Sequence, residues 1–102
     1  GRLTMMTLTR EDYLQSGADI SHTDKIVNYG LYMPGVEMAC LAHEMDDGIK
    51  FSLRSIEPRQ VSGLAARFGG GGHAQASGCT VYAPLNEAVR LIREAALEEL
   101  SR

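Results

Sequence analysis

The sequence has only two cysteines among its 102 residues, and it has no apolar run long enough to span a bilayer. Cys40 and Cys79 are too few for a disulfide framework or for a set of zinc ligands. Each lies in an apolar stretch, which favours buried free thiols in a reducing compartment. A signal-peptide pattern is also absent, so we expect a cytoplasmic protein that makes no membrane contact.

Lysine is rare, since Lys25 and Lys50 stand against eight arginines, and the formal net charge is −3. A negative chain lacks the basic coat that is typical of general nucleic-acid binders. The planar guanidinium fork of arginine nevertheless suits bidentate contact with phosphate or carboxylate, so a local anion site stays open. The chain begins with Gly rather than Met, and we expect a fragment of a longer protein.

The length suits one compact domain, and hydrophobic residues make up 44% of the chain, enough for a single core. Thr9, three residues before Asp12, favours a short helix that ends before Gly17. The remaining pattern predicts strands at 2–9, 36–44, 49–55 and 77–82, and helices at 21–33, 59–68 and 84–100. This order indicates an α/β fold: a single domain with a mixed sheet of about five strands flanked by helices.

The middle of the chain predicts an antiparallel hairpin. Residues 36–44 are apolar on both faces, which favours a central strand, and the turn signal Asp46-Asp47-Gly48 follows. In IKFSLRS (49–55) apolar residues alternate with Lys50, Ser52 and Arg54, so one face is polar. The expected core includes Phe51, Leu53, Leu64, Phe68, Val89 and Ile92.

Residues 68–78 read FGGGGHAQASG, and their four consecutive glycines need a reason beyond an ordinary turn. Gly69 is well placed as the left-handed cap of the helix before it. The surplus predicts a close approach to the backbone, with the N–H groups of Gly70, Gly71 and Gly72 forming a concave anion site. A flexible loop with an exposed histidine is the weaker alternative.

Two side chains could complete this anion site. His73 supplies a donor whose charge responds near neutral pH, and Arg54 adds a guanidinium fork if the sheet brings it near. Known phosphate loops do not fit, because no Lys follows the glycines and the order is helix, loop, strand. A second histidine, His43, lies near Glu44 and Asp46, where a solvated strand end is favoured over a metal pair.

Three stretches taken together resemble a known family: SLRS at 52–55, VSGLAARF at 61–68 and GGGGHAQASG at 69–78. They are similar to the DHH-associated domain, the C-terminal half of DHH-family phosphoesterases, and most of all to the nanoRNase and phosphoadenosine-phosphatase type. The resemblance extends over nearly the whole of residues 1–102. One departure is Ser77, where the family usually has Ala, and we expect the loop geometry to survive it.

The resemblance implies a division of labour in a longer parent protein. An N-terminal DHH domain would hold two manganese ions through Asp and His residues, while this domain binds the nucleotide end of the substrate. Carried over, Arg54 and Ser55 would contact substrate, and Gly70–Gly72 with His73 would hold a phosphate near the metals. No Asp-His-His sequence and no alternative metal set occur in this chain. We therefore expect the fragment alone to be inactive, with His73 lending transition-state support in the parent.

The implied function is substrate binding for a manganese-dependent hydrolase of short oligoribonucleotides, dinucleotides or 3′-phosphoadenosine 5′-phosphate. The implied partners are that substrate and the N-terminal DHH domain of the same chain, and a homodimer of the parent stays open. Two other classes are alternatives: a stand-alone nucleic-acid-binding module as in alanyl-tRNA synthetases, and part of a cyclic-dinucleotide phosphodiesterase. His73 directly after the glycines, together with Arg54, favours the phosphoesterase type over the synthetase module.

Overall fold

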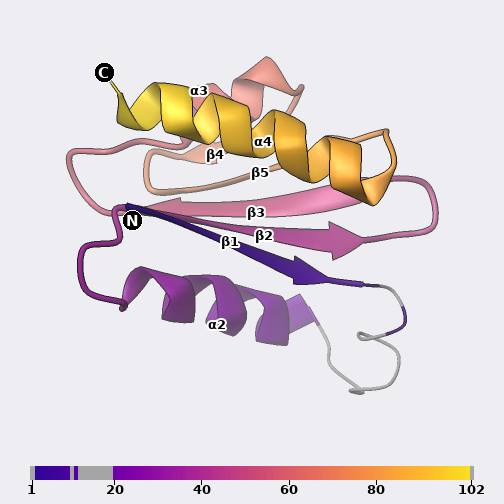
Figure 1. Cartoon of the computed structure of the whole chain (residues 1–102), viewed down its shortest axis with the longest axis horizontal. Helices are drawn as coiled ribbons and strands as arrows, with labels where there is room; N and C mark the ends of the chain where they lie inside the picture. The colour runs from indigo at the N-terminus through magenta and orange to yellow at the C-terminus, as the bar shows by residue number, and fades with distance from the viewer. Residues whose placement is uncertain (1, 10, 12–19, 102) are drawn as a thin grey trace.

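The computed structural model describes residues 2–9, 11 and 20–101, and these form a five-stranded sheet with the order β1-β2-β3-β5-β4 (Figure 1). The strands are β1 (Leu3–Leu8), β2 (Met38–Glu44), β3 (Ile49–Ser55), β4 (Gly71–His73) and β5 (Ala76–Val81). The helices are α2 (Ile20–Leu31), α3 (Ser62–Arg67) and α4 (Leu85–Leu100). β1 is parallel to β2 and the other pairs are antiparallel, so the predicted mixed α/β sheet is confirmed. The short helix predicted to end before residue 17 lies outside the described residues.

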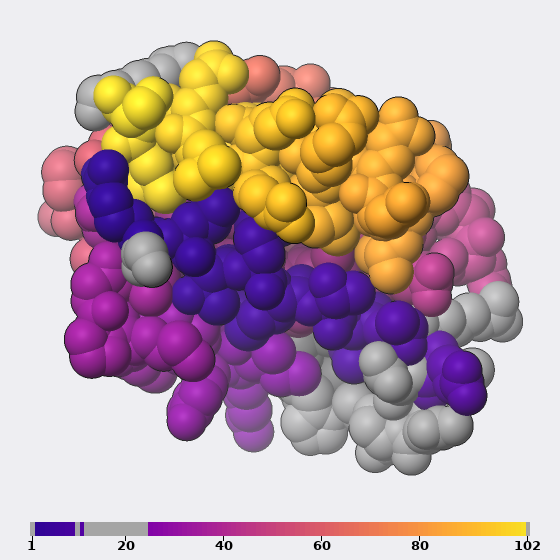
Figure 2. Space-filling view, viewed as in Figure 1, coloured from indigo at the N-terminus to yellow at the C-terminus, as the bar shows by residue number. Residues whose placement is uncertain are grey.

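Helices cover the two faces of the sheet unequally. In Figure 1, α3 and α4 lie on one face, and α2 lies on the other beside β1 and β2. β2 is buried on both faces, as its apolar sequence predicts: Met38, Cys40 and Ala42 join the larger core cluster, and Ala39 and Leu41 join a smaller one. The space-filling view shows β1 as a band between α4 and α2, which marks β1 as one edge of the sheet (Figure 2).

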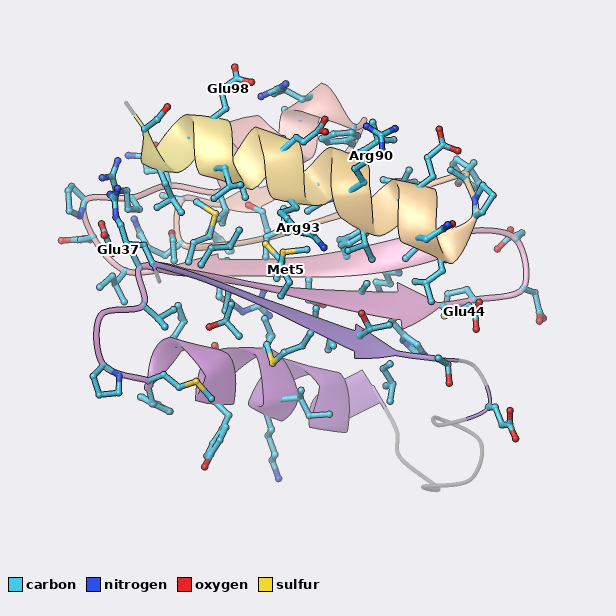
Figure 3. All side chains as sticks on the ribbon, in the orientation of Figure 1. Met5, Glu37, Glu44, Arg90, Arg93 and Glu98 are labelled. Atoms are coloured by element: carbon cyan, nitrogen blue, oxygen red, sulfur yellow. The ribbon has the colours of Figure 1, made fainter. Side chains whose placement is uncertain are left out.

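The larger core lies between the sheet and the helices α3 and α4. Phe51, Leu53 and Ile92 are fully buried, and Leu64 is 3% exposed, as predicted. Phe68 and Val89 are only partly buried against this cluster. On the edge strand, Met5 points from β1 toward α4 and packs against the same cluster (Figure 3).

The smaller core sits under α2, and a glycine sets how closely this helix approaches the sheet. A Cβ on Gly30 would lie 2.8 Å from Cε of Met6 in β1 and 3.4 Å from Cβ of Ala39 in β2. The helix therefore packs tightly against this face, where it lies near β2, β3 and β1. The strands β5 and β4, at the other side of the sheet, keep exposed and half-buried residues on this face.

The two cysteines are buried free thiols, as predicted. Cys40 and Cys79 both face the larger core. Burial raises the pKa of Cys40 to about 12, with a smaller contribution from Cys79, and burial raises the pKa of Cys79 to about 11. Both side chains are thus neutral apolar packing groups at physiological pH. No helix in the described part of the chain is long and apolar enough to cross a membrane.

Helix α3 is shorter than the predicted 59–68, because the chain before it is bonded elsewhere. The Val61 N–H donates to the carbonyl of Ala74 at 2.7 Å, a contact that a residue inside a regular helix could not make. The end of α3 agrees with the prediction. Gly69 has φ of 80° and its N–H donates to Ala66, while the Gly70 N–H donates to Ala65. Together these bonds form a Schellman cap.

The glycines after the cap form an edge strand rather than the predicted loop. Gly71, Gly72 and His73 pair with Gly78, Ser77 and Ala76 of β5. A Cβ on Gly70 would lie 2.1 Å from the Gly78 carbonyl oxygen, and Gly72 combines φ of 145° with a Cβ position 2.7 Å from the Ala76 oxygen. At Gly71 nothing lies within 4 Å of a Cβ. The fold therefore requires three of the four glycines and leaves Gly71 unexplained.

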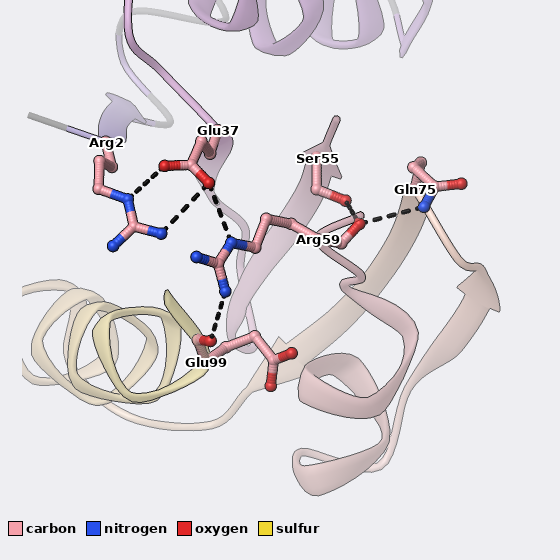
Figure 4. Close-up of polar contacts among 6 residues, drawn as sticks. All are labelled: Arg2, Glu37, Ser55, Arg59, Gln75 and Glu99. Atoms are coloured by element: carbon pink, nitrogen blue, oxygen red, sulfur yellow. Dashed lines mark hydrogen bonds and ion pairs between the residues drawn. The ribbon is translucent and has the colours of Figure 1, made fainter. Parts of the chain in front are cut away.

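Charged side chains join the ends of several elements at one corner of the sheet (Figure 4). Glu37 accepts hydrogen bonds from Nε and Nη2 of Arg2 and, at 3.0 Å, from Nε of Arg59. The Arg59 Nη1 also donates to the carbonyl of Glu99 near the end of α4, at 3.4 Å. The hydrogen bonds from Arg2 and then Arg59 lower the pKa of Glu37 to about 2.

The backbone of Arg59 is held at the same corner. Its carbonyl oxygen accepts from Oγ of Ser55 at 2.9 Å and from Nε2 of Gln75 at 3.1 Å. The Ser55 N–H donates in turn to the Gln75 carbonyl at 3.1 Å. The end of β3 and the turn between β4 and β5 are thereby bonded to one residue, which positions the strands that carry the polar face.

Substitution of Gly70 tests whether the glycine run is required by the backbone of β5. We expect Gly70→Ala to lower the free energy of unfolding by about 2–3 kcal/mol, because the new methyl group overlaps the Gly78 carbonyl. Gly71→Ala is the matched control, and we expect it to change stability by no more than about 0.5 kcal/mol. Urea denaturation followed by circular dichroism measures both, and equal effects would contradict this account.

Substitution of Glu37 tests the corner network through pH. A carboxyl whose pKa is lowered on folding stabilises the fold above its ordinary pKa, and that contribution disappears as pH falls from about 4.5 to about 2. Glu37→Gln should therefore be less stable than the parent chain at pH 7, with the difference vanishing near pH 2. Urea denaturation at several pH values measures it, and the exposed Glu57→Gln is the control. A pH-independent difference would contradict the role of charge.

Candidate functional site

One row of residues crosses the three strands β3, β5 and β4. Arg54 pairs with Ala76, and Ala76 pairs with His73. Directly opposed residues of neighbouring strands place their side chains on the same face of the sheet. With strands about 4.8 Å apart, the Cα atoms of Arg54 and His73 are about 10 Å apart, with only the methyl group of Ala76 between them.

The row belongs to a larger surface on the side of the sheet that α2 covers only in part. We call this surface the open face. A second row contains Ser52, Gly78 and Gly71, and a third contains Lys50 and Thr80. All these residues are exposed or half-buried. The middle of the open face has almost no side-chain bulk, so a ligand can approach the main chain there.

The open face is positive although the whole chain is not. Its strand residues include Arg54, Lys50 and His73 but no carboxylate, in a chain of net charge −3. Nη1 of Arg54 donates to the carbonyl of Leu53 at 3.0 Å, which holds the half-buried guanidinium against the sheet. This concentration of positive charge beside main-chain groups favours an anionic ligand.

Two of the predicted site residues, Ser55 and Gly70, use their polar groups in hydrogen bonds within the protein. Ser55 is only 5% exposed and lies on the opposite face from Arg54, where its hydroxyl donates to Arg59. The N–H of Gly70 donates to Ala65 in the helix cap. Gly71 and Gly72 lie on the edge strand β4, where the N–H groups that do not pair with β5 face outward.

His73 ends the edge strand and is exposed on the open face. Its carbonyl oxygen accepts a hydrogen bond from Oγ of Ser77 at 2.6 Å. Ser77 is the position that departs from the family pattern, and it is 5% exposed. Ser77 thus adds a hydrogen bond inside the β4–β5 hairpin, and this bond involves the main chain of His73 rather than its imidazole ring.

His43 is not at a solvated strand end, contrary to the sequence prediction. It is 7% exposed, and it lies between Leu8 of β1 and Lys50 of β3 in the sheet. Burial lowers the pKa of His43, and the neighbouring Lys50 ammonium lowers it further. The residues that the structure describes contain no group of three or more His, Cys, Asp or Glu side chains that could hold a metal ion.

Sequence reasoning missed several residues that complete or support this surface. Lys50 and Ser52 were recognised as the polar face of β3 but not as neighbours of the glycine run. Alternation along β3 could have placed both on the open face, because they share a strand face with Arg54. Gln75 stands within the GGGGHAQASG stretch, but its bond to Arg59 depends on a turn that no local pattern indicates.

Comparisons with known proteins identify the family and the fold. The family model described as the DHHA1 domain matches residues 6–102. A curated relative, the bifunctional oligoribonuclease and PAP phosphatase NrnA of Thermus thermophilus, is 32% identical over 81 residues. That alignment covers 78% of this chain and 25% of the relative, so this chain spans about a quarter of the relative's length.

Solved structures share the fold. An exopolyphosphatase-related protein from Bacteroides fragilis is 32% identical, with a TM-score of 0.87 over 95% of this chain and 29% of that one. The fold also matches the pGpG-specific phosphodiesterase PggH of Vibrio cholerae, at TM-score 0.62 and 20% identity over 94% of this chain and 33% of that one.

A domain of an alanyl-tRNA synthetase has a similar fold. The C-Ala domain of Aquifex aeolicus alanyl-tRNA synthetase matches with a TM-score of 0.64 at 15% identity, over 91% of this chain and 88% of that one. At such low identity the likeness shows the fold alone. The family match, by contrast, extends over almost all of the sequence, including β3, β4 and β5. The chain therefore belongs to the DHHA1 domain family.

Proposed function

We propose that this chain is the substrate-binding domain of a DHH-family, manganese-dependent phosphoesterase. The proposed substrates are short oligoribonucleotides, dinucleotides or 3′-phosphoadenosine 5′-phosphate. The observation that carries the proposal is the row in which Arg54 and His73 flank Ala76, with His73 on the edge strand β4. A relative named as an oligoribonuclease and PAP phosphatase supports the substrate class.

In this proposal, a substrate phosphate rests on the open face between Arg54 and His73. The guanidinium fork makes charge-assisted hydrogen bonds to the phosphate oxygens, and the imidazole supplies a further donor. Outward N–H groups of the edge strand add main-chain donors. Gly71 is suited to this contact because nothing occupies the space where its side chain would be.

The chemistry of hydrolysis is assigned to a domain outside this chain. The described residues do not fit a metal centre, since no suitable group of three ligands occurs among them. We assign the manganese ions to the parent's N-terminal DHH domain. The contribution of this chain is then to orient the phosphate and to stabilise the charge that develops on it.

Substitution of Arg54 and His73 in the full-length parent tests the site. Arg54→Ala should weaken dinucleotide binding or turnover by about 2–3 kcal/mol, the range for charge-assisted hydrogen bonds. His73→Ala should lower kcat more than it raises KM, because its donor acts on developing charge. Steady-state kinetics on a dinucleotide measures both effects.

Two variants serve as controls for those kinetics. Arg90→Ala removes an exposed arginine that forms an ion pair with Glu94 on α4, which lies on the other side of the sheet from the open face. It should leave kcat and KM unchanged. Gly71→Ala should keep the stability of the fold but weaken binding, because its methyl group occupies the approach to the strand. Unchanged constants for both Arg54→Ala and His73→Ala would remove the site assignment.

The isolated chain provides a further test of the division of labour. We expect it to hydrolyse no dinucleotide and to bind manganese no more tightly than a surface carboxylate does, because the metal ligands are assigned to another domain. Isothermal titration calorimetry with Mn²⁺ and a dinucleotide cleavage assay measure these properties. Stoichiometric micromolar binding of Mn²⁺ would overturn this assignment.

A further inference from the structure

A pocket of about 520 Å³ opens at the far end of the open face. It lies over the part of β5 that β4 leaves uncovered, because β4 pairs with β5 only as far as Gly78. The lining residues that matter below are Lys50, Phe68, Gly70, Gly78, Thr80 and Tyr82. We call it the Tyr82 pocket.

Tyr82 is a large aromatic residue that is exposed to solvent. The residue is 78% exposed, and its ring lies beside Gly48 of the β2–β3 turn. A Cβ on Gly48 would lie 3.1 Å from Cδ1 of Tyr82, so the absence of a side chain at Gly48 makes room for the ring. Phe68, half-buried at the end of α3, lines the pocket as a second aromatic ring.

The Tyr82 pocket is continuous with the proposed phosphate site. Lys50 and Gly78 belong both to the open face and to the pocket lining. Along β3, Arg54 and Lys50 are four residues apart, which corresponds to about 13 Å of strand. A phosphate bound at Arg54 cannot reach Lys50, whereas a nucleotide chain extending along β5 can.

We propose that the Tyr82 pocket binds a nucleobase of the substrate whose phosphate lies at Arg54 and His73; this inference rests on the proposed function. Bases of single-stranded nucleic acids stack on exposed aromatic rings, and the stacking tolerates any base because each has a π-face. Lys50 stands where it can neutralise a phosphodiester next to that base. The pocket therefore selects for a substrate longer than a free phosphate.

Two probes separate the pocket from the phosphate site. Isotope-labelled chain is titrated with inorganic phosphate and with the dinucleotide pApA, and amide shifts are followed by NMR. Inorganic phosphate should shift the amides near Arg54, Gly71 and His73 but not those of Thr80 and Tyr82. The dinucleotide should also shift those of Thr80 and Tyr82.

Variants of the pocket and matched controls decide the assignment. Tyr82→Ala should weaken pApA binding about tenfold, in the range of one stacked base, and Tyr82→Phe should restore most of it. Lys50→Ala should weaken pApA binding as well, and neither alanine variant should change the affinity for inorganic phosphate. Tyr29→Ala and Lys25→Ala alter an exposed tyrosine and the second lysine, both on α2, and should have no effect.

The outcomes distinguish the two proposals. One outcome is that pApA shifts the amides near Gly71 and that Arg54→Ala weakens pApA binding, whereas Tyr82→Ala and Lys50→Ala leave pApA binding unchanged. In that case the pocket assignment is wrong and the phosphate site stands. If Arg54→Ala changes the affinity for neither phosphate nor pApA, or if pApA shifts the amides of neither the Gly71 region nor the Tyr82 region, the proposed function is wrong. Because the chain has no tryptophan, Tyr82→Trp adds a single tryptophan, and quenching of its emission by pApA but not by phosphate would support stacking.

Discussion

The close contact between the glycine run and the backbone of β5 determines where the edge strand and His73 lie in the candidate site. A side chain on Gly70 would overlap the Gly78 carbonyl, and one on Gly72 would meet the Ala76 carbonyl. Because β4 fits against β5 in this register, His73 stands opposite Ala76, and Ala76 stands opposite Arg54. The geometry of the polar row is thus a property of main-chain packing rather than of contacts between the polar side chains themselves.

Much of the fold could be predicted because strong local patterns agreed with the tertiary structure. The alternation through Phe51 and Leu53 predicts both the burial of β3 and the polar face that carries Arg54. The apolar run of β2 predicts burial on both sides, and helices cover both sides. Gly69 was predicted as a helix cap because a left-handed residue at that position has few alternatives to glycine.

The remaining features depend on long-range contacts that no local pattern contains. Glycine is depleted in strands, so the sequence of Gly71–His73 does not predict a strand. The segment becomes the strand β4 only because it pairs with β5. The family resemblance implies a shared role for Ser55 and Arg54, but neighbouring strand residues face opposite sides of a sheet. His43 was placed in solvent because its position between β1 and β3 in the sheet is not visible in its own sequence.

The unequal covering of the sheet separates stability from recognition. Most of the apolar burial lies between the sheet and the helices α3 and α4, whereas the polar rows lie on the other face, which α2 covers only in part. Side chains there can be exchanged over generations without repacking the larger core, so a lineage can change what it recognises at little cost in folding. Solved proteins of the same fold carry names for different activities, at identities as low as 15%. A scaffold with one structural face and one replaceable face is well suited to such divergence.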